Sequence, residues 1–369
     1  MSNGLEKITM SEITIVVFIP TLERGGAEKQ AVMLTNALQK NFKIILVVWN
    51  GNLVAPNFKL YVEENKIHTV FLIGSLPLKF FHFYTLLRTA KVKFIFSFLA
   101  SSNFFGALAG KLAGVSTIVG GIRNAEIPRF KLMLQMYLHN HLLDFTIFNN
   151  FAGKENLIKK GFHKNKCVVV PNCLELSTNK IVRENKQNVT IISLARFVPQ
   201  KDFYTALQAI HYLVKKFNFN STEIKYLIVG YGEQENKIYA WIKKLCLEKY
   251  VEVIVNPNNP LNLVKESDIF LSSSIFEGTS NSIMEAMAFS LPIVATDAGD
   301  NRFLVENNKN GFVSPIKDYE QLAINLERLI RNSKLRNEFG KFSYQKIKNE
   351  YSIANFRNKY LTLIEQCIV

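Results

Sequence analysis

Short apolar runs alternate with helical patterns along almost the whole chain, and this alternation most restricts the possible fold. The run 13–19 is almost continuously apolar, as in a strand buried on both faces of a parallel sheet. Similar runs recur at 44–49, 68–72, 93–97, 117–119, 145–148, 168–170, 189–194, 226–229, 251–255, 269–271 and 293–295. Strands that alternate with helices predict an α/β protein with doubly wound, Rossmann-like parallel sheets.

The length of 369 residues favours two domains of ordinary size over one. The composition shifts after Pro171 and Asn172, and the segment 176–188 is polar and rich in Lys, Asn and Glu, as in a linker. We therefore expect an N-terminal domain over 1–180 and a C-terminal domain over 186–350. Helical patterns over 318–330, 334–350 and 352–367 close the chain, and no strand follows the last one.

The segment 276–289, FEGTSNSIMEAMAF, carries two carboxylates, Glu277 and Glu285, on either side of a small polar turn. An apolar run precedes the turn and a helix-forming stretch follows it, so the pattern predicts strand, turn and helix. A helix N-terminus offers unpaired N–H groups that suit a phosphate, and carboxylates suit hydroxyl groups. This combination indicates a nucleotide-sugar. We expect neither glutamate to lie in a core.

A simpler interpretation of the same segment stays open at this point. Ser282 and Glu285 also fit a capping box, in which the glutamate only closes its own helix. Glu277 would then be a solvated turn residue.

Two cations, Arg196 and Lys201, flank a loop between the apolar run 189–194 and a helical pattern. Ligands bind at the carboxyl ends of strands in open α/β sheets, where two fixed cations can neutralise a diphosphate leaving group. Both could equally be ordinary surface charges. Gly230 and Gly232 form a G-x-G after another strand, but Glu235 stands where a dinucleotide fingerprint needs glycine, which disfavours a nicotinamide enzyme.

The net charge of +15 indicates attraction to an anionic partner, although the charge is scattered along the chain. Segments 78–93 and 129–143 mix aromatic and aliphatic residues with Lys and Arg, which suits an interfacial helix on anionic lipid or a core-facing helix with snorkelling lysines. We favour the membrane surface. The uncharged run 94–110 is the one transmembrane candidate, and a buried strand followed by a helix start is the better interpretation.

The four cysteines form no C-x-x-C pair and show no metal-ligand spacing, which favours reduced thiols in the cytosol. The first ten residues lack the apolar region of a signal peptide.

The chain resembles retaining glycosyltransferases of family 4, which have the GT-B architecture, and in particular those of bacterial surface polysaccharides. The resemblance covers nearly the whole length after residue 25. It rests on a series of short motifs at strand ends: GGAE at 25–28, GIRNAE at 121–126, PNCLE at 171–175, LAR at 194–196 with Lys201 and Asp202, VGYG at 229–232, and FEGTSNSIMEAMA at 276–288 with PIVAT at 292–296.

The resemblance implies roles for the matching residues. Arg196 and Lys201 would grip the donor diphosphate, and Glu277 would bind hydroxyls of the donor sugar. Glu285 would take the ribose hydroxyls. Further donor contacts would come from the small residues Gly278, Thr279, Ser280, Asn281 and Ser282 and from Gly25, Gly26, Gly230 and Gly232. The family transfers sugar with retention, by front-face attack that requires neither a protein base nor a metal ion.

The chain departs from the family pattern in its first half. Many relatives place a histidine near the sugar, but the segment 94–103 has none. Candidates for sugar or acceptor contacts are therefore Ser97, Asn103, Arg123 and Glu126. His139 and His141 are expected at the surface or facing lipid. Cys173 replaces the glycine of a Pro-Asn-Gly motif, and the C-terminal helix 352–369 is expected to pack back on the first domain.

We therefore expect a metal-independent enzyme with its active site between two α/β halves. It would transfer a hexose or N-acetylhexosamine from a nucleoside diphosphate sugar to a polyprenyl-pyrophosphate-linked glycan. We expect the nucleotide of the donor to be UDP. It would act from the cytoplasmic side as a peripheral protein of the inner membrane face. Two alternatives stay open: a UDP-sugar epimerase of the same architecture, and a basic nucleic-acid-binding protein, which the scattered charge disfavours.

Overall fold

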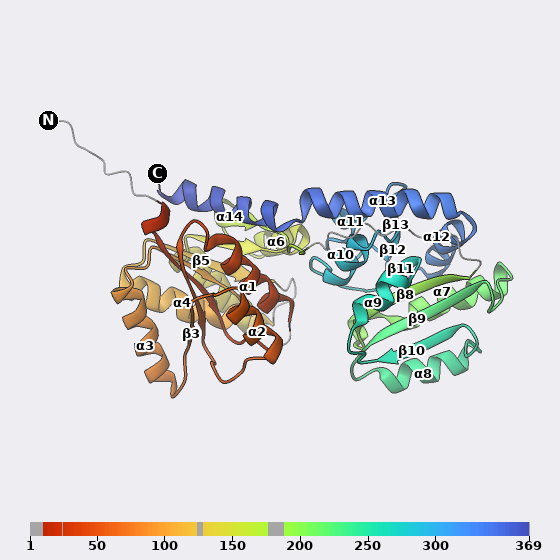
Figure 1. Ribbon diagram of the computed structural model, residues 1–369, viewed down its shortest axis with the longest axis horizontal. Coiled ribbons are helices and arrows are strands. Elements are labelled where there is room, and N and C mark those ends of the chain that lie inside the picture. Colours follow the sequence, from red (N-terminus) through yellow and green to blue (C-terminus); the bar gives the residue numbers. More distant parts are fainter. Residues whose placement is uncertain (1–9, 24, 124–127, 176–187, 369) are drawn as a thin grey trace. The chain divides into compact units, whose positions relative to one another are not determined.

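The computed structural model describes residues 10–23, 25–123, 128–175 and 188–368. These residues form two compact units. One comprises the chain up to Cys173 together with the segment from Ile353 onward, and the other comprises Leu174–Ser352. Each unit is built around a parallel sheet (Figure 1).

The first unit contains a seven-stranded parallel sheet of order β3-β2-β1-β4-β5-β6-β7. Its strands are β1 (Thr14–Ile19), β2 (Lys43–Val48), β3 (Thr69–Phe71), β4 (Phe94–Ser97), β5 (Thr117–Ile122), β6 (Phe145–Phe148) and β7 (Cys167–Val169). The helices are α1 (Gly26–Leu38), α2 (Pro56–Glu64), α3 (Leu76–Thr89), α4 (Ala100–Ala113), α5 (Arg129–Tyr137) and α6 (Phe151–Lys159), with α14 (Ile353–Ile368) added from the end of the chain. Short helical turns are η1 (Met10–Glu12), η2 (Leu138–Leu142) and η3 (Lys164–Lys166).

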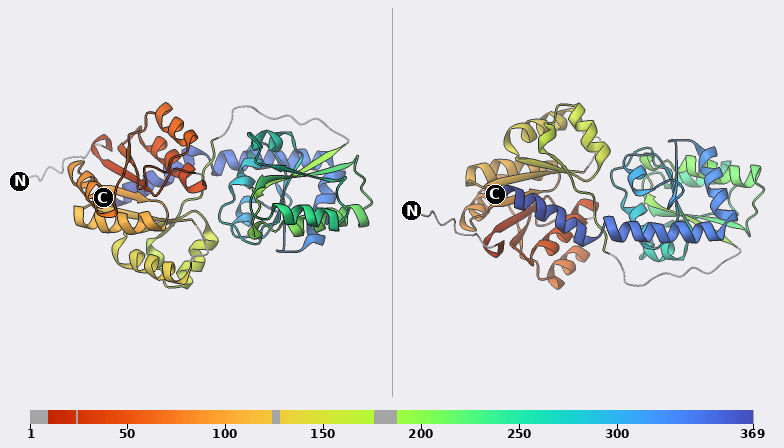
Figure 2. Two further views of the ribbon diagram at one scale, coloured as in Figure 1. Left: turned by 90° about the horizontal axis from the view of Figure 1, so that it is seen from below. Right: turned by 90° about the horizontal axis from the view of Figure 1, so that it is seen from above.

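Strand β1 shows how the sequence makes this sheet buried on both faces. Ile15 and Val17 pack into the core formed with α1, α2 and α14, whereas Val16 and Phe18 pack into the core formed with α3 and α4. Successive side chains point to opposite faces of a strand, so a continuous apolar run supplies both cores. Figure 2 shows α14, in blue, lying across this sheet, where Tyr360 is buried.

The second unit contains a six-stranded parallel sheet of order β10-β9-β8-β11-β12-β13. Its strands are β8 (Val189–Arg196), β9 (Ile224–Tyr231), β10 (Val251–Val255), β11 (Ile269–Ser272), β12 (Ile293–Thr296) and β13 (Gly311–Ser314). The helices are α7 (Phe203–Lys216), α8 (Glu235–Lys244), α9 (Pro260–Glu266), α10 (Asn281–Ala288), α11 (Asn301–Leu304), α12 (Tyr319–Arg331) and α13 (Ser333–Glu350), with the turn η4 (Pro199–Lys201). Helices α7, α8 and α12 cover one face, and α9 and α10 cover the other.

In each sheet the first three strands are added toward one edge, and the remaining strands are added on the other side of the first strand. The position between the first strand and the fourth is therefore the point where the strand order reverses. In the first unit it lies between β1 and β4, and in the second between β8 and β11. Loops leave these neighbouring strands toward opposite faces, which opens a crevice at their carboxyl ends where ligands bind. The doubly wound parallel fold class predicted from the sequence is confirmed, with one crevice of this kind in each unit.

Two segments show where the local sequence pattern predicted the secondary structure and where it did not. The strand β13 was not predicted, because its four residues follow an Asn-rich turn and carry little apolar pattern. The uncharged run 94–110 forms β4 and most of α4, in agreement with the interpretation as a buried strand and helix start. None of the helices in the described ranges is long and apolar enough to cross a membrane.

The expectation that His139 lies at the surface is wrong. Its side chain is fully buried: Nδ1 lies 2.7 Å from Thr146 Oγ1, and Nε2 lies 3.1 Å from the carbonyl oxygen of His163. Burial lowers the pKa of His139 to about 4, so the ring is neutral at physiological pH. The two hydrogen bonds compensate for its removal from water. His141, two residues on, is exposed as expected.

Candidate active site

Lys201 and Glu277 meet at the reversal point of the second sheet, where Arg196 ends the neighbouring strand. Arg196 is the last residue of β8 and is exposed, and Lys201 ends the short turn after it. Glu277 follows β11, which is hydrogen-bonded to β8. Parallel strands end at the same edge of a sheet, so residues about eighty positions apart become neighbours there.

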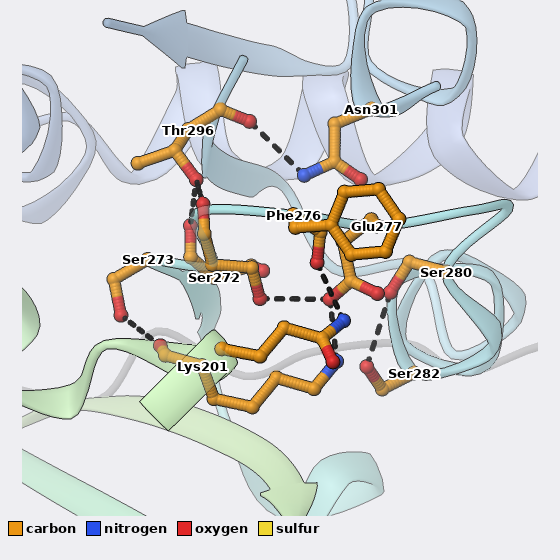
Figure 3. A network of polar contacts seen from close by, with 11 residues as sticks. Lys201, Ser272, Ser273, Phe276, Glu277, Ser280, Ser282, Thr296 and Asn301 are labelled. Carbon is orange, nitrogen blue, oxygen red and sulfur yellow. Dashed lines mark hydrogen bonds and ion pairs between the residues drawn. The ribbon is translucent and has the colours of Figure 1, made fainter. Parts of the chain in front are cut away.

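Lys201 and Glu277 form a close ion pair with an Nζ–Oε1 distance of 2.5 Å (Figure 3). Ser274 Oγ donates a second hydrogen bond to the same carboxylate oxygen over 2.7 Å. Only 6% of Glu277 is exposed, so the expectation that this residue lies outside a core is wrong. A buried carboxylate must be paired and hydrogen-bonded, and Lys201 and Ser274 satisfy this requirement.

The two loops that carry the pair are also joined through their backbones. Gln200 Nε2 donates to the carbonyl oxygen of Phe276 over 2.7 Å, and its own carbonyl accepts from the Ile275 amide over 2.9 Å. Ser273 Oγ donates to the carbonyl oxygen of Lys201 over 2.9 Å. These bonds fix the distance between the loops, and therefore the position of the ion pair. Sequence reasoning missed Ser273 and Gln200, since only their contacts across 72 and 76 positions reveal their roles.

A third segment, from the end of β12 to the start of α11, supports the loop that carries Glu277. Thr296 Oγ1 donates to the carbonyl oxygen of Ser274 over 2.5 Å, and Asn301 Nδ2 donates to the carbonyl oxygen of Thr296 over 3.0 Å. Gly299 has φ +58°, and a Cβ there would stand 2.0 Å from the carbonyl oxygen of Glu277. Only glycine allows this close approach without displacing Glu277.

Helix α10 begins beside the ion pair, and half of the predicted donor-binding residues lie in its first turn and in the loop just before it. Ser280 is the N-cap and makes no side-chain capping bond, while its hydroxyl lies 3.3 Å from that of Ser282. Thr279 and Ser280 are buried, and Gly278, Asn281 and Ser282 are partly exposed.

Glu285 does not belong to a capping box. That motif would need Ser282 as the N-cap, but the helix starts at Asn281, which makes Glu285 its fifth residue. Its side chain is partly exposed. Glu285 therefore stands one turn into the helix that begins next to the Lys201–Glu277 pair.

The glycines at the end of β9, Gly230 within the strand and Gly232 just after it, are required by the close packing there. Gly230 and Gly232 have φ values of +155° and +146°. Their added Cβ atoms would lie 1.9 Å from the carbonyl oxygen of Ala195 and 2.6 Å from that of Phe197. Both glycines therefore let the end of β9 approach the end of β8, where Arg196 stands between Ala195 and Phe197. Their contact with a donor stays a prediction.

The remaining predicted residues lie in the first unit. Gly25 is exposed and is the N-cap of α1, and Gly26 is its first residue. Arg123 follows β5; its guanidinium carbon lies 4.5 Å from the centre of the Phe98 ring, and its NH1 donates to Asn172 Oδ1 over 2.7 Å. Burial lowers the pKa of Arg123. Glu126 lies outside the described residues.

Asn103 and Ser97 are buried in the first unit. Asn103 Nδ2 donates to Gly121 O and to Gln135 Oε1, and its Oδ1 accepts from the Gly121 amide. The side-chain amide of Asn103 is fully buried, and both its nitrogen and its oxygen are hydrogen-bonded. Its role in the structure is therefore to hold β5 against α4 and α5. The Ser97 hydroxyl is buried without a hydrogen-bond partner among the described residues.

The second-unit site can bind and stabilise negative charge beside hydroxyl groups. An ammonium group has three protons, so Lys201 can hold Glu277 and still donate to a phosphate. Arg196, an exposed guanidinium on the adjacent strand end, and the first turn of α10 add positive potential. Within the described ranges, no group of three His, Cys, Asp or Glu residues is close enough to hold a metal ion.

Comparison with solved structures identifies the fold. Anabaena HepE in complex with UDP superposes with a TM-score of 0.83 at 16% identity, covering 96% of this chain and all of that one. Staphylococcus aureus TarM superposes with a TM-score of 0.77 at 14% identity, covering 96% and 99%. The fold of this chain is the GT-B fold of glycosyltransferases.

Sequence comparison agrees. Residues 177–346 match the family model of glycosyl transferases group 1, so the second unit carries a domain of this family and the chain is a glycosyltransferase. A Campylobacter jejuni relative, the N-acetylgalactosamine-N,N'-diacetylbacillosaminyl-diphospho-undecaprenol 4-alpha-N-acetylgalactosaminyltransferase, is 24% identical over 94% of this chain and 98% of its own length. An Escherichia coli UDP-Gal:alpha-D-GlcNAc-diphosphoundecaprenol alpha-1,3-galactosyltransferase is 24% identical over 78% of each chain.

Proposed function

We propose that this protein transfers a hexose or N-acetylhexosamine from a UDP-sugar to a polyprenyl-diphosphate-linked glycan, with retention of configuration and without a metal ion. The observation that carries the proposal is the buried Lys201–Glu277 pair beside the first turn of α10, at the reversal point of the second sheet. It sets a carboxylate for sugar hydroxyls next to cations and N–H groups for a diphosphate.

The donor assignment draws on the site and on its relatives. Solved structures of HepE contain UDP and UDP-glucose, and the E. coli relative is named for UDP-galactose. In our proposal Arg196 and Lys201 meet the diphosphate, Glu277 positions the sugar, and Glu285 binds the ribose. Fixed cations and a helix N-terminus stabilise the departing diphosphate by preorganised charge, which is why the proposal needs no metal ion.

Retention results in this proposal from attack on the face from which the diphosphate leaves. The leaving phosphate oxygen accepts the acceptor's proton, the bond from the sugar carbon to the acceptor oxygen forms, and the bond to the phosphate oxygen breaks. Glu277 is already paired with Lys201 and Ser274, so it suits a positioning contact better than the part of a free general base.

The acceptor assignment draws on the relatives and on one face of the first unit. The C. jejuni and E. coli relatives are both named for undecaprenol-linked acceptors. Helices α3, α4 and α5 contain five basic residues and no Asp or Glu, and α4 packs against the other two. Exposed apolar side chains on this helix layer are Leu76, Leu78, Phe81, Leu108, Leu112, Phe130, Met133 and Tyr137.

A basic layer whose helices contain no Asp or Glu, although Lys111 pairs with the neighbouring Asp144 over 3.8 Å, and which exposes apolar side chains suits an anionic lipid surface. We therefore propose that the protein works as a peripheral protein on the cytoplasmic membrane face.

Calorimetric titration with UDP, GDP and ADP in the presence of EDTA tests the donor half of the proposal. We expect selective binding of UDP to the full chain without added metal. A transfer assay with UDP-sugars and an undecaprenyl-diphosphate-linked sugar then tests the reaction, and NMR of the product reports its anomeric configuration. Absence of nucleotide binding, or conversion of the UDP-sugar to its epimer without an acceptor, would contradict the proposal.

A further inference from the structure

The carboxylate of Glu277 uses its two oxygens unequally. Oε1 accepts two hydrogen bonds, one from Lys201 Nζ over 2.5 Å and one from Ser274 Oγ over 2.7 Å. Among the described residues no donor is bonded to Oε2, and this oxygen is not one of the fully enclosed polar atoms that lack a partner. In Figure 3 it is directed toward the start of α10, where Ser280 is labelled. One oxygen is therefore occupied by the protein, and the other is open to a ligand.

Lys201 alone does not decide which of the two oxygens is occupied. Its ammonium group carries three protons at the end of a flexible four-carbon chain, so it can bond to either oxygen. A half-turn of the carboxylate would exchange the oxygens and keep the ion pair. The second donor, Ser274, has a single proton on a short side chain, and only 2% of this residue is exposed. A hydroxyl group in a fixed position therefore selects one oxygen.

The neighbouring strand holds Ser274 in this position. Thr296, the last residue of β12, is fully buried, and its Oγ1 donates to the carbonyl oxygen of Ser274 over 2.5 Å. Strand β12 pairs in parallel with β11 as far as Ser272, two residues before Ser274. The backbone of Ser274 is thus fixed to the sheet on both sides of its own strand end.

We propose that Ser274 is a positioning residue for the transfer reaction: it holds Oε1 of Glu277, so that Oε2 accepts a hydroxyl group of the donor sugar. Thr296 supports this serine from the adjacent strand. The inference rests on the proposed function, which assigns the sugar to Glu277, and it adds the residue that orients the carboxylate. An acceptor that is oriented in advance requires no reorganisation of the site during the reaction.

Ser274→Ala removes the hydroxyl group and should affect turnover but not nucleotide binding. The transfer assay uses whichever of UDP-glucose, UDP-galactose and their N-acetyl forms supports transfer by the unmodified protein. We expect kcat to fall about tenfold, the effect of losing one hydrogen bond to a charged group. The Kd for UDP should stay unchanged, because UDP lacks the transferred sugar. Thr296→Val acts one step further away and should lower kcat about threefold.

Ser267→Ala is the matched control in the same unit. Ser267 is fully buried, and its hydroxyl donates to the carbonyl oxygen of Leu263 over 2.7 Å at the end of α9. The bond that it loses has the same length as that of Ser274 but does not involve Glu277. Both variants should lower the melting temperature, and only Ser274→Ala should lower kcat. Equal falls of kcat in the two variants would overturn the inference, because they would reflect a general loss of stability.

A double variant separates positioning from a purely structural role. In the Glu277→Gln background, Ser274→Ala should lower kcat less than about twofold further, because the carboxylate that Ser274 orients is already gone. A further fall of about tenfold would overturn the inference, since independent effects multiply.

The outcomes also separate this inference from the proposed function. UDP binding and sugar transfer with an unchanged kcat in folded Ser274→Ala would overturn the positioning role and leave the glycosyltransferase proposal standing. Absence of UDP binding by the unmodified protein would instead contradict the proposed function.

Discussion

The two units have the same doubly wound topology, but their reversal points contain opposite kinds of chemistry. In the first unit the strand ends border a cavity of about 580 Å³ lined mostly by carbon, with Arg123 among the lining residues. In the second unit the strand ends hold the Lys201–Glu277 ion pair above a cavity of only about 10 Å³. The topology therefore decides where a ligand binds, and the residues of the loops decide which ligand.

The difference comes from the residues that succeed each strand. After β4 the chain continues through Leu99 into α4, which is rich in Ala and Phe. After β11 it continues with serines and Glu277. We assign the polar crevice to the nucleotide-sugar and the apolar one to the lipid-linked acceptor. A substitution in one unit can break one side of this comparison and leave the other side as its control.

The largest effect should come from Glu277→Gln, which keeps the shape of the side chain but removes its charge. We expect turnover to fall roughly 10²–10³-fold, the range for losing one preorganised electrostatic contact, while UDP affinity changes little. Steady-state kinetics and calorimetry measure the two quantities.

Glu277→Ala is less informative, because it leaves a largely buried Lys201 without its partner and should lower stability by several kcal/mol. Unchanged turnover in folded Glu277→Gln would contradict the role assigned to this pair.

Glu285→Ala should act on nucleotide binding instead of on the chemical step. Losing two hydrogen bonds to the ribose would weaken UDP binding about tenfold, and the folded state should persist because Glu285 is partly exposed. Calorimetry of UDP with the variant measures this change. An unaltered Kd would remove Glu285 from the donor site.

A smaller effect is expected on the membrane face. Phe81, 61% exposed on α3, should contribute to binding of anionic phospholipid vesicles, and Phe81→Ser should reduce that binding roughly fivefold. Phe342 on α13 of the second unit is similarly exposed, so Phe342→Ser is the matched control and should bind vesicles like the unmodified protein. Sedimentation with vesicles of mixed phosphatidylglycerol and phosphatidylethanolamine measures both, and equal loss in the two variants would contradict an assignment to the first unit.

The smallest effect at neutral pH concerns the buried His139 of the first unit. Its pKa of about 4 in the folded state lies below the ordinary value of 6.5, so the unfolded chain takes up the proton first as the pH falls. The contribution of neutral His139 to the free energy of unfolding is therefore fully present above about pH 6.5. It declines between pH 6.5 and 4, by at most about 1.4 kcal/mol per pH unit.

His139→Gln should make the loss of stability with falling pH shallower in the first unit. The stability of the second unit should not change, because His139 lies in the first unit. Urea unfolding of the protein and the variant at about pH 7.5 and about pH 5, on either side of the ordinary histidine pKa, provides the test. A decline of equal steepness in both would show that other groups control the acid sensitivity.

Much of the fold could be predicted because strands buried on both faces of a parallel sheet appear in the sequence as continuous apolar runs. Strands such as β1 and β12 were located to within a residue or two, and the short β13 was missed because four residues after a turn give no periodic signal. The segment around Glu277 was recognised as strand, turn and helix for the same reason.

The state of the site residues could not be predicted from local sequence. Glu277 is buried because Lys201, 76 positions earlier, neutralises it, and no local pattern encodes that partner. Asn103 was a candidate for a ligand contact, yet its amide is consumed by Gly121 and Gln135. The cavity of the first unit combines three strand ends with two helices, so only the tertiary structure brings its lining together.

Hydrogen–deuterium exchange of the full chain, with UDP and with farnesyl diphosphate in turn, tests the division of labour between the two reversal points most directly. We predict that UDP slows exchange in residues 273–285 of the second unit, and that farnesyl diphosphate slows exchange in 99–105 and 128–135 of the first. Slowing of 99–105 and 128–135 by UDP without any change in 273–285 would contradict the account.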